Sequence, residues 1–226
     1  LADFARRFAV WWFGAHTPGS GARLEQALFA PLLRTPQTAV LFSKDMRRLF
    51  TTLPSRICAD MLEKRPLLAE QVARLPELMA EPRRKLAQLS AAANRNALTL
   101  RAADTAFGLL ELQGMKISTH LRIATVLREA AGMADPAASA AGVTGAAQLL
   151  SRLHAALDAS VEQYREFVEH CGGSRGDLVQ LQAQADDAGQ LSQRLHSVAG
   201  QIAARTMRPC DLAEPLVMLL KRNIMR

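Results

Sequence analysis

Two segments of the sequence hold ionisable side chains whose spacing could support chemistry, 162–177 and 186–187. Glu166 precedes His170 by four residues, so both side chains share one face of a helix, as metal ligands do in helical bundles. A helical di-iron site needs Glu-x-x-His on two helices, and the sequence has no second copy. The adjacent His170 and Cys171 point to different sides of a helix, so a Cys–His catalytic couple would need partners from elsewhere. The sequence therefore predicts no bound metal and no catalytic residue.

The glycine-rich stretch 172–177 opens a helix, where free backbone N–H groups could hold an anion. It lacks the spacing and the lysine of a phosphate-binding loop, and the carboxylate of Asp177 would repel an anion. We therefore interpret it as a turn between two helices. The remaining carboxylates, Glu162, Glu169 and the pair Asp186-Asp187, are typical of solvated helix faces. No cofactor is predicted.

An aromatic face begins the chain. It consists of Phe4, Phe8, Trp11 and Trp12, at positions i, i+4, i+7 and i+8 of a helix, with Arg6 and Arg7 beside it. In one interpretation this face docks on the protein core. In another it lies in a lipid interface, where tryptophan is favoured and arginine meets anionic headgroups. A third interpretation makes it an interface with a protein partner.

The net charge is +7, and most of it lies in the first half of the chain. The basic clusters are Arg47-Arg48, Arg83-Arg84-Lys85 and Lys221-Arg222. If these clusters shared a face, they would neutralise phosphates and bind an anionic surface in a salt-dependent way. Acidic residues are interleaved throughout, and aromatics make up only 5% of the chain, which disfavours a base-stacking surface for nucleic acid.

The element that must organise these groups is the long stretch 82–132. Apolar residues recur in it at steps of three and four: Leu86, Leu89, Ala93, Ala97, Leu100, Ala103, Phe107 and Leu110. A single rod of this length is hard to fit into a compact domain, and glycine weakens a helix interior. We therefore expect two helices that meet near 108–116, between Gly108 and Gly114, with one elongated rod as the alternative.

Prolines punctuate the chain before this stretch. The sequence predicts a loop at 16–22 and helices over 22–33, from Thr35-Pro36, from Pro54 and from Pro66. Pro76 should kink or end the last of these helices, because it removes a backbone hydrogen bond and clashes one turn back.

After the long stretch, residues 134–145 are Ala, Gly, Ser and Pro with almost no bulky side chain, which predicts a linker. A helix over 145–171 follows, then a helix capped by Asp177 that runs toward Met207 with coiled-coil-like heptad spacing, which predicts an antiparallel hairpin. A last helix is expected from Glu214. The predicted division is a basic helical bundle at 1–133, the linker 134–145, and the hairpin with the terminal helix at 146–226, with one continuous domain as the alternative.

The predicted fold is an all-α multi-helix bundle, since no strand pattern of period two is found. By elimination, the leading function is a non-catalytic helical interaction module that binds another protein or itself: an adaptor, a chaperone-like protein, or a bacterial secretion or virulence accessory. One alternative is binding of membrane headgroups or nucleic acid through the basic first half. The other is a helical enzyme or small-ligand receptor whose site forms only in three dimensions. The expected location is the cytoplasm, or that of a secreted effector.

Overall fold

The computed structural model describes residues 2–26, 50–57, 66–171 and 174–212. Within these ranges the chain is all-α and has no strand. The helices are α1 (Ala2–Phe13), α2 (Ser20–Leu24), the short 3₁₀ helix η4 (Pro54–Arg56), α5 (Pro66–Ala73), α6 (Leu75–Ala92), α7 (Ala97–Gly132), α8 (Pro136–Cys171), α9 (Arg175–Ala203) and the 3₁₀ helix η5 (Pro209–Leu212). The predicted fold class is confirmed.

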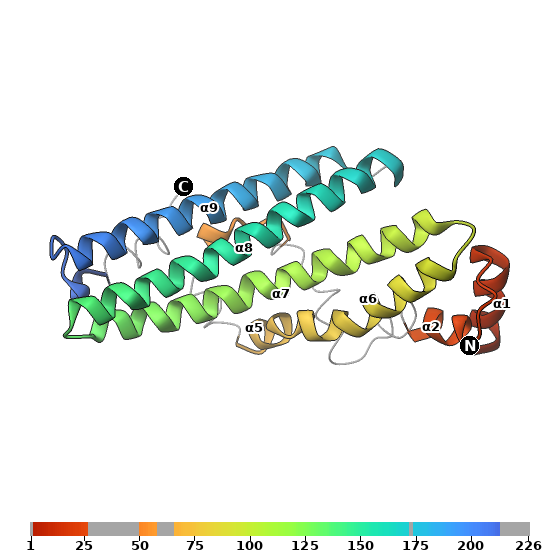
Figure 1. The fold of residues 1–226 in the computed structure, drawn as a ribbon, viewed down its shortest axis with the longest axis horizontal. Helices are drawn as coiled ribbons and strands as arrows, with labels where there is room; N and C mark the ends of the chain where they lie inside the picture. The colour runs from red at the N-terminus through yellow and green to blue at the C-terminus, as the bar shows by residue number, and fades with distance from the viewer. Residues whose placement is uncertain (1, 27–49, 58–65, 172–173, 213–226) are drawn as a thin grey trace.

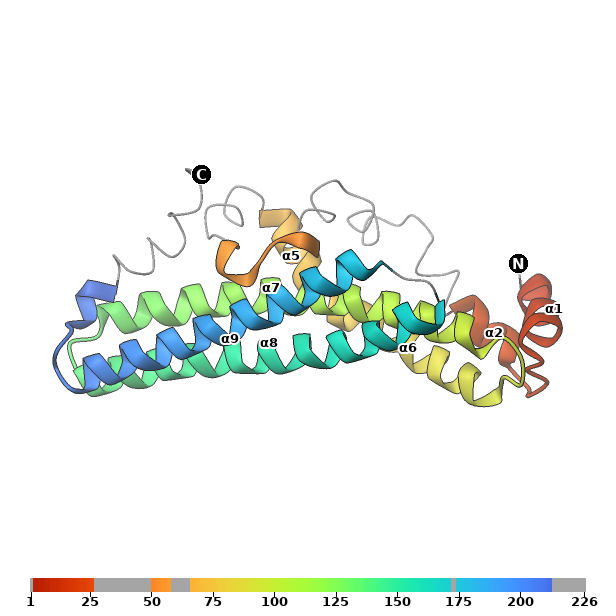
Figure 2. The same ribbon diagram turned by 90° about the horizontal axis from the view of Figure 1, so that it is seen from above.

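Three long helices form an elongated bundle. α7, α8 and α9 run side by side along the long axis, and α6 lies beside the N-terminal half of α7 (Figures 1 and 2). α7 alone, with 36 residues, is about 54 Å long at 1.5 Å per residue. α1 and α2 sit at one tip of the bundle, next to the turn between α6 and α7 (Figure 1).

The bundle core confirms the heptad pattern of the last third. Buried aliphatic side chains from α7, α8 and α9 form one cluster, in which Leu150, Leu153, Leu157, Ala185, Ala188 and Ile202 have no exposed surface. Burying a leucine stabilises a fold by about 1.5–3 kcal/mol. The predicted antiparallel hairpin is α8 packed on α9.

The expected junction at 108–116 is wrong. α7 continues through both glycines, and the break lies at 93–96, between α6 and α7. Gly114 permits a close contact between helices, because a Cβ at this position would lie 2.3 Å from Cδ of Pro76 and 2.7 Å from the carbonyl oxygen of Val72. The glycine lets α7 approach the α5–α6 joint closely, so it marks a contact between helices.

Some prolines mark the start of a helix, and one lies inside a helix. α5 ends at Ala73 and α6 begins at Leu75, with Pro76 in its first turn, so the expected interruption at Pro76 is confirmed. Pro82 begins the long stretch 82–132 that was expected to be helical, but it lies inside α6, which starts at Leu75, and is buried. The helix that begins at Pro54 is a 3₁₀ turn that ends at Arg56, followed by the extended Ile57 at the end of this described range. The helix from Thr35-Pro36 and the one from Glu214 lie outside the described residues.

The segment 134–145 is largely helical, contrary to the prediction of a linker. α8 begins at Pro136, and only Met133–Asp135 connect it to α7. The small residues of this segment allow close packing, since a Cβ at Gly142 would lie 3.2 Å from Cβ of Ala130 on α7. The core cluster extends across the predicted boundary. The division into two domains remains a prediction.

Smaller boundaries also shift. Ser20–Ala22, expected as loop, are the first residues of α2. Ser174, and not Asp177, is the N-cap of α9, because its hydroxyl accepts a hydrogen bond from the Asp177 N–H at 3.3 Å. α9 ends at Ala203, four residues before the expected end.

Candidate functional site

The aromatic face of α1 points outward. Phe4 is 56% exposed, Trp11 68% and Trp12 36%, and Phe8 is half-buried. The rings of Phe4, Phe8 and Trp12 stack along the helix, with centroids 5.7 and 5.9 Å apart. We call these four residues, with Arg6 and Arg7, the α1 surface. The interpretation in which this face docks on the core is wrong for Phe4 and Trp11.

Two alanines and Phe13 dock α1, in place of the predicted aromatic face. Ala5, Ala9 and Phe13, spaced by four, are fully buried. α1 lies so close to α2 that a Cβ at Gly21 would come within 2.4 Å of Cα of Arg6. Because the neighbouring helix approaches the alanine side, the large rings are left on the opposite side.

The α6–α7 turn fixes the C-terminal end of α1. The backbone N–H groups of Asn94 and Arg95 both donate to the Phe13 carbonyl at 3.1 Å. The Asn96 side-chain amide donates to the Trp12 carbonyl at 2.8 Å. These bonds satisfy carbonyls that a helix end leaves without intrahelical partners. α1 is therefore held in one orientation, with its rings presented at the tip.

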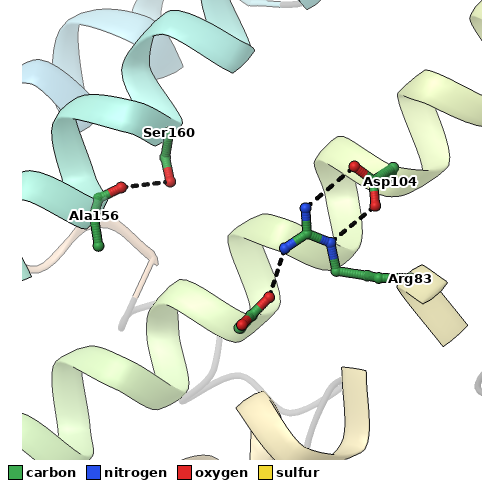
Figure 3. A network of polar contacts seen from close by, with 5 residues as sticks. Arg83, Asp104, Ala156 and Ser160 are labelled. Carbon is green, nitrogen blue, oxygen red and sulfur yellow. Dashed lines mark hydrogen bonds and ion pairs between the residues drawn. The ribbon is translucent and has the colours of Figure 1, made fainter. Parts of the chain in front are cut away.

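The predicted basic cluster at 83–85 is divided. Arg83 is half-buried and donates from Nε to Asp104 at 2.8 Å and from Nη1 to Glu111 at 2.6 Å. Figure 3 shows the Arg83 guanidinium turned toward Asp104 on α7. Ser160 of α8, drawn in the same view, donates instead to the Ala156 carbonyl of its own helix. The hydrogen bonds with Asp104 and Glu111 raise the pKa of Arg83 further above its usual value, against the effect of burial.

The other two members of this cluster also have acidic neighbours. Arg84 and Lys85 pair with Glu81 at 2.6 and 3.1 Å, and these contacts lower the pKa of Glu81. Arg83 thus bridges α6 to α7, while Arg84 and Lys85 lie beside a carboxylate of their own helix. Arg47 and Arg48 lie outside the described residues.

A second candidate site, in the middle of the bundle, escaped the sequence analysis. Residues 50–57, which we call the strap, lie against α7 and α9, whose side chains bind its backbone. Two side chains donate to alternate carbonyls of the strap: Gln184 Nε2 to Phe50 at 2.9 Å and Lys116 Nζ to Thr52 at 2.9 Å. The His120 ring contacts two carbonyls, with Nε2 2.6 Å from the Pro54 oxygen and Nδ1 2.8 Å from the Lys116 oxygen. Asp187 accepts from the backbone N–H and the hydroxyl of Ser55, both at 2.6 Å.

Lys116, His120, Gln184 and Asp187 form what we call the strap site, and the first three are buried. Burial lowers the pKa of Lys116 to about 7, although the carboxylate of Asp187 acts in the opposite direction. Burial also lowers the pKa of His120, against its two carbonyl contacts, and the charge of Lys116 adds to the lowering. Lys116 Nζ also donates to Gln184 Oε1 at 2.5 Å. The site can hold a backbone segment in place and can titrate near neutral pH.

One signal in the sequence could have located the strap site. Gln113, Lys116 and His120 follow one another at steps of three and four, and the same spacing continues through Ile123 and Leu127, which are buried. Polar residues that interrupt a buried stripe need internal partners. The interpretation of Asp187 as part of a solvated face was wrong, because it binds Ser55.

A cleft of about 500 Å³ lies between α6, α7 and the last turns of α8. Its ionisable side chains are Arg101, Asp104, Glu166, Glu169 and His170. Asp104 is bound to Arg83, and Nδ1 of His170 contacts the Glu166 carbonyl of its own helix at 2.8 Å. Asp104 and His170, two of the ionisable residues in this cleft, are therefore already held by contacts within the protein.

The described residues were also searched for a metal-binding cluster and for a membrane-spanning helix. Among the described residues, no group of three His, Cys, Asp or Glu is placed to hold a metal ion. No helix in the described ranges is both long and apolar enough to cross a bilayer.

Comparison of the chain with protein-family models, with curated proteins and with solved structures gave no match.

Proposed function

We propose that this protein is a non-catalytic helical interaction module that binds a protein partner through the α1 surface. The observation that carries the proposal is the exposure of Phe4 and Trp11 on a helix whose alanine side is docked. An aromatic patch that remains exposed in the folded chain favours binding, and tryptophan and arginine are the residues most enriched at interface hot spots.

The fixed orientation of α1 supports the same proposal. Because the α6–α7 turn caps α1 at Trp12 and Phe13, the rings need little ordering when a partner arrives. Preorganisation reduces the entropic cost of association. The long bundle then acts as a rigid support that presents the α1 surface at one tip.

The charges favour a protein over an anionic membrane as the partner. Asp3 lies between the two arginines of α1, 2.8 Å from Arg6 and 2.9 Å from Arg7. Glu81, Asp104 and Glu111 likewise accompany the basic residues at 83–85. An anionic surface would meet little uncompensated positive charge at these two places.

The test is site-specific photo-crosslinking in the native host. A photoreactive residue at position 11 should capture one defined protein, and a matched residue at the exposed Gln193 of α9 should not. With the captured protein purified, Trp11→Ser should weaken binding at least tenfold, as expected for a hot-spot tryptophan. Equal capture at positions 11 and 193, or unchanged affinity of the Trp11→Ser variant, would refute the proposal.

Two further measurements separate the alternatives. Sedimentation of the pure chain tests for a second copy as the partner. Co-sedimentation with vesicles of neutral and of anionic lipid tests for a membrane surface. Binding to anionic vesicles that is lost in Trp11→Ser would replace the protein partner by a lipid surface.

A further inference from the structure

Two of the side chains that hold the strap are bases, buried one helical turn apart on α7. Lys116 has no exposed surface, and His120 is 8% exposed. Nζ of Lys116 donates to the Thr52 carbonyl at 2.9 Å, and Nε2 of His120 lies 2.6 Å from the Pro54 oxygen. Because each base contacts the strap directly, release of the strap would return both bases to water.

The hydrogen bonds that the His120 ring can make depend on its protonation. The ring lies between two carbonyls, since its Nδ1 is 2.8 Å from the Lys116 oxygen while its Nε2 faces the strap. A neutral imidazole carries one N–H and donates to one of these carbonyls, whereas an imidazolium donates to both. Hydrogen bonding taken alone would therefore favour the charged ring.

Burial and the neighbouring charge act against the charged ring. An imidazolium at this position gives up its hydration and lies close to the ammonium of Lys116. Burial has the largest effect and lowers the pKa of His120, in spite of the two carbonyls, and the charge of Lys116 adds to the lowering. Release of the strap removes both penalties, so the released state binds a proton more readily than the docked state does.

A carboxylate on α9 also acts on both bases. Asp187 opposes the effect of burial on the pKa of Lys116 and of His120, and it accepts from the N–H and the hydroxyl of Ser55, both at 2.6 Å. Two other charged residues on elements packed here, Arg56 of the strap and Glu70 of α5, are exposed. The charge buried under the strap therefore changes with the protonation of the two bases.

We propose that the strap is an acid-sensitive latch, which docks on α7 and α9 at neutral pH and is released when His120 takes up a proton. The ring of a released strap site titrates at about pH 6.5, as an exposed histidine does. Since the docked ring resists protonation, each pH unit below this value shifts the equilibrium about tenfold toward release, until the docked ring also titrates. Lys116 acts in the same direction and mostly above pH 7, because the released lysine holds its proton to about pH 10.4.

The experiment is hydrogen exchange of the whole chain between pH 7.5 and 5.5, with each rate divided by the intrinsic rate at that pH to give an opening constant. The Ser55 amide, which donates to Asp187, reports release of the strap. The amide of Leu157, in the buried core of α8, reports unfolding of the bundle. We expect the opening constant at Ser55 to rise at least about tenfold on acidification, and to exceed that at Leu157 at every pH.

Variants assign the response to one ring. His120→Gln keeps an amide that can donate to the Pro54 carbonyl but cannot titrate, so its opening constant at Ser55 should change by less than about fivefold, through Lys116. His196→Gln, on the exposed side of α9, is the matched control and should keep the wild-type response.

The wild-type profile tests the proposal even if His120→Gln does not fold. An opening constant at Ser55 that is independent of pH would overturn the latch. A constant that falls on acidification would overturn it too, because the imidazolium would then tie the strap through both nitrogens. Equal opening at Ser55 and Leu157, or a wild-type response in His120→Gln, would have the same consequence.

Discussion

The α1 surface exposes aromatic side chains of a kind that proteins usually bury, whereas the strap site buries ionisable side chains of a kind that proteins usually expose. At the tip, tryptophan and phenylalanine face solvent while alanines are buried. In the middle of the bundle, a lysine and a histidine are buried under the strap. Exposed rings need no compensating contact for the chain to fold, whereas buried charged or polar groups must be hydrogen-bonded. The tip can therefore be changed with little effect on stability, and the strap site cannot.

The largest effect should come from changing the charge of Lys116. The unfolded chain keeps this proton until about pH 10.4, whereas the folded chain releases it near pH 7. Between these values the unfolded state binds more protons, so the stability contributed by this residue rises with pH, by up to about 1.4 kcal/mol per unit. The stability that Lys116 contributes therefore decreases as the pH is lowered from about 10 toward 7.

Urea unfolding from pH 6.5 to 9.5 of the wild type and of Lys116→Met would measure this contribution. We expect the wild type to gain stability relative to the variant as the pH rises, by a few kcal/mol in total. Asp187 and His120 also face this lysine, so the difference between the two proteins is the quantity to compare. Parallel pH profiles would show that Lys116 titrates as an ordinary exposed lysine.

Removal of the Asp187 carboxylate should come next in size. Asp187→Ala leaves the Ser55 N–H without its acceptor, and we expect a loss of about 1–3 kcal/mol in the free energy of unfolding. Hydrogen exchange of the Ser55 amide should accelerate as well. Asp186→Ala is the matched control: this exposed neighbour accepts a hydrogen bond from the Gln182 side chain, and its loss should change stability by no more than about 0.5 kcal/mol.

At the tip, the buried side of α1 should be sensitive to added volume. Ala9 has no exposed surface, so Ala9→Leu overpacks the contact and should cost about 1–3 kcal/mol, measured by thermal or urea unfolding. Ala106→Leu on the exposed face of α7 serves as the control and should be close to neutral. If Ala9→Leu were neutral too, the alanine side of α1 would not be its docking face.

The smallest effect on stability should come from the outward side of the same helix. Trp11→Ser removes a ring that is 68% exposed, and we expect the unfolding free energy to change by no more than about 0.5 kcal/mol. Binding of the captured partner should nevertheless fall at least tenfold. A large loss of stability in Trp11→Ser would show that the ring packs within the fold, and the contrast between the two regions would fail.

Periodicity by itself determined the all-α fold, the hairpin of α8 and α9, and the buried stripe that includes Leu86, Leu89 and Leu100, because apolar residues that recur each turn must be buried together. It also identified α1 as an aromatic helix. These features depend on local spacing along the chain. They are therefore visible without any knowledge of which helices become neighbours.

The tertiary structure decided what each ambiguous residue does. Gly114 and the small residues at 134–145 look like interruptions, yet they allow helices to approach closely, which depends on what packs opposite them. The exposure of Trp11 depended on α2 packing against the alanine side of α1 and on the α6–α7 turn fixing the C-terminal end of that helix. The strap site joins residues 50–55 to residues 116–187, and no local pattern records a contact between segments so far apart in sequence.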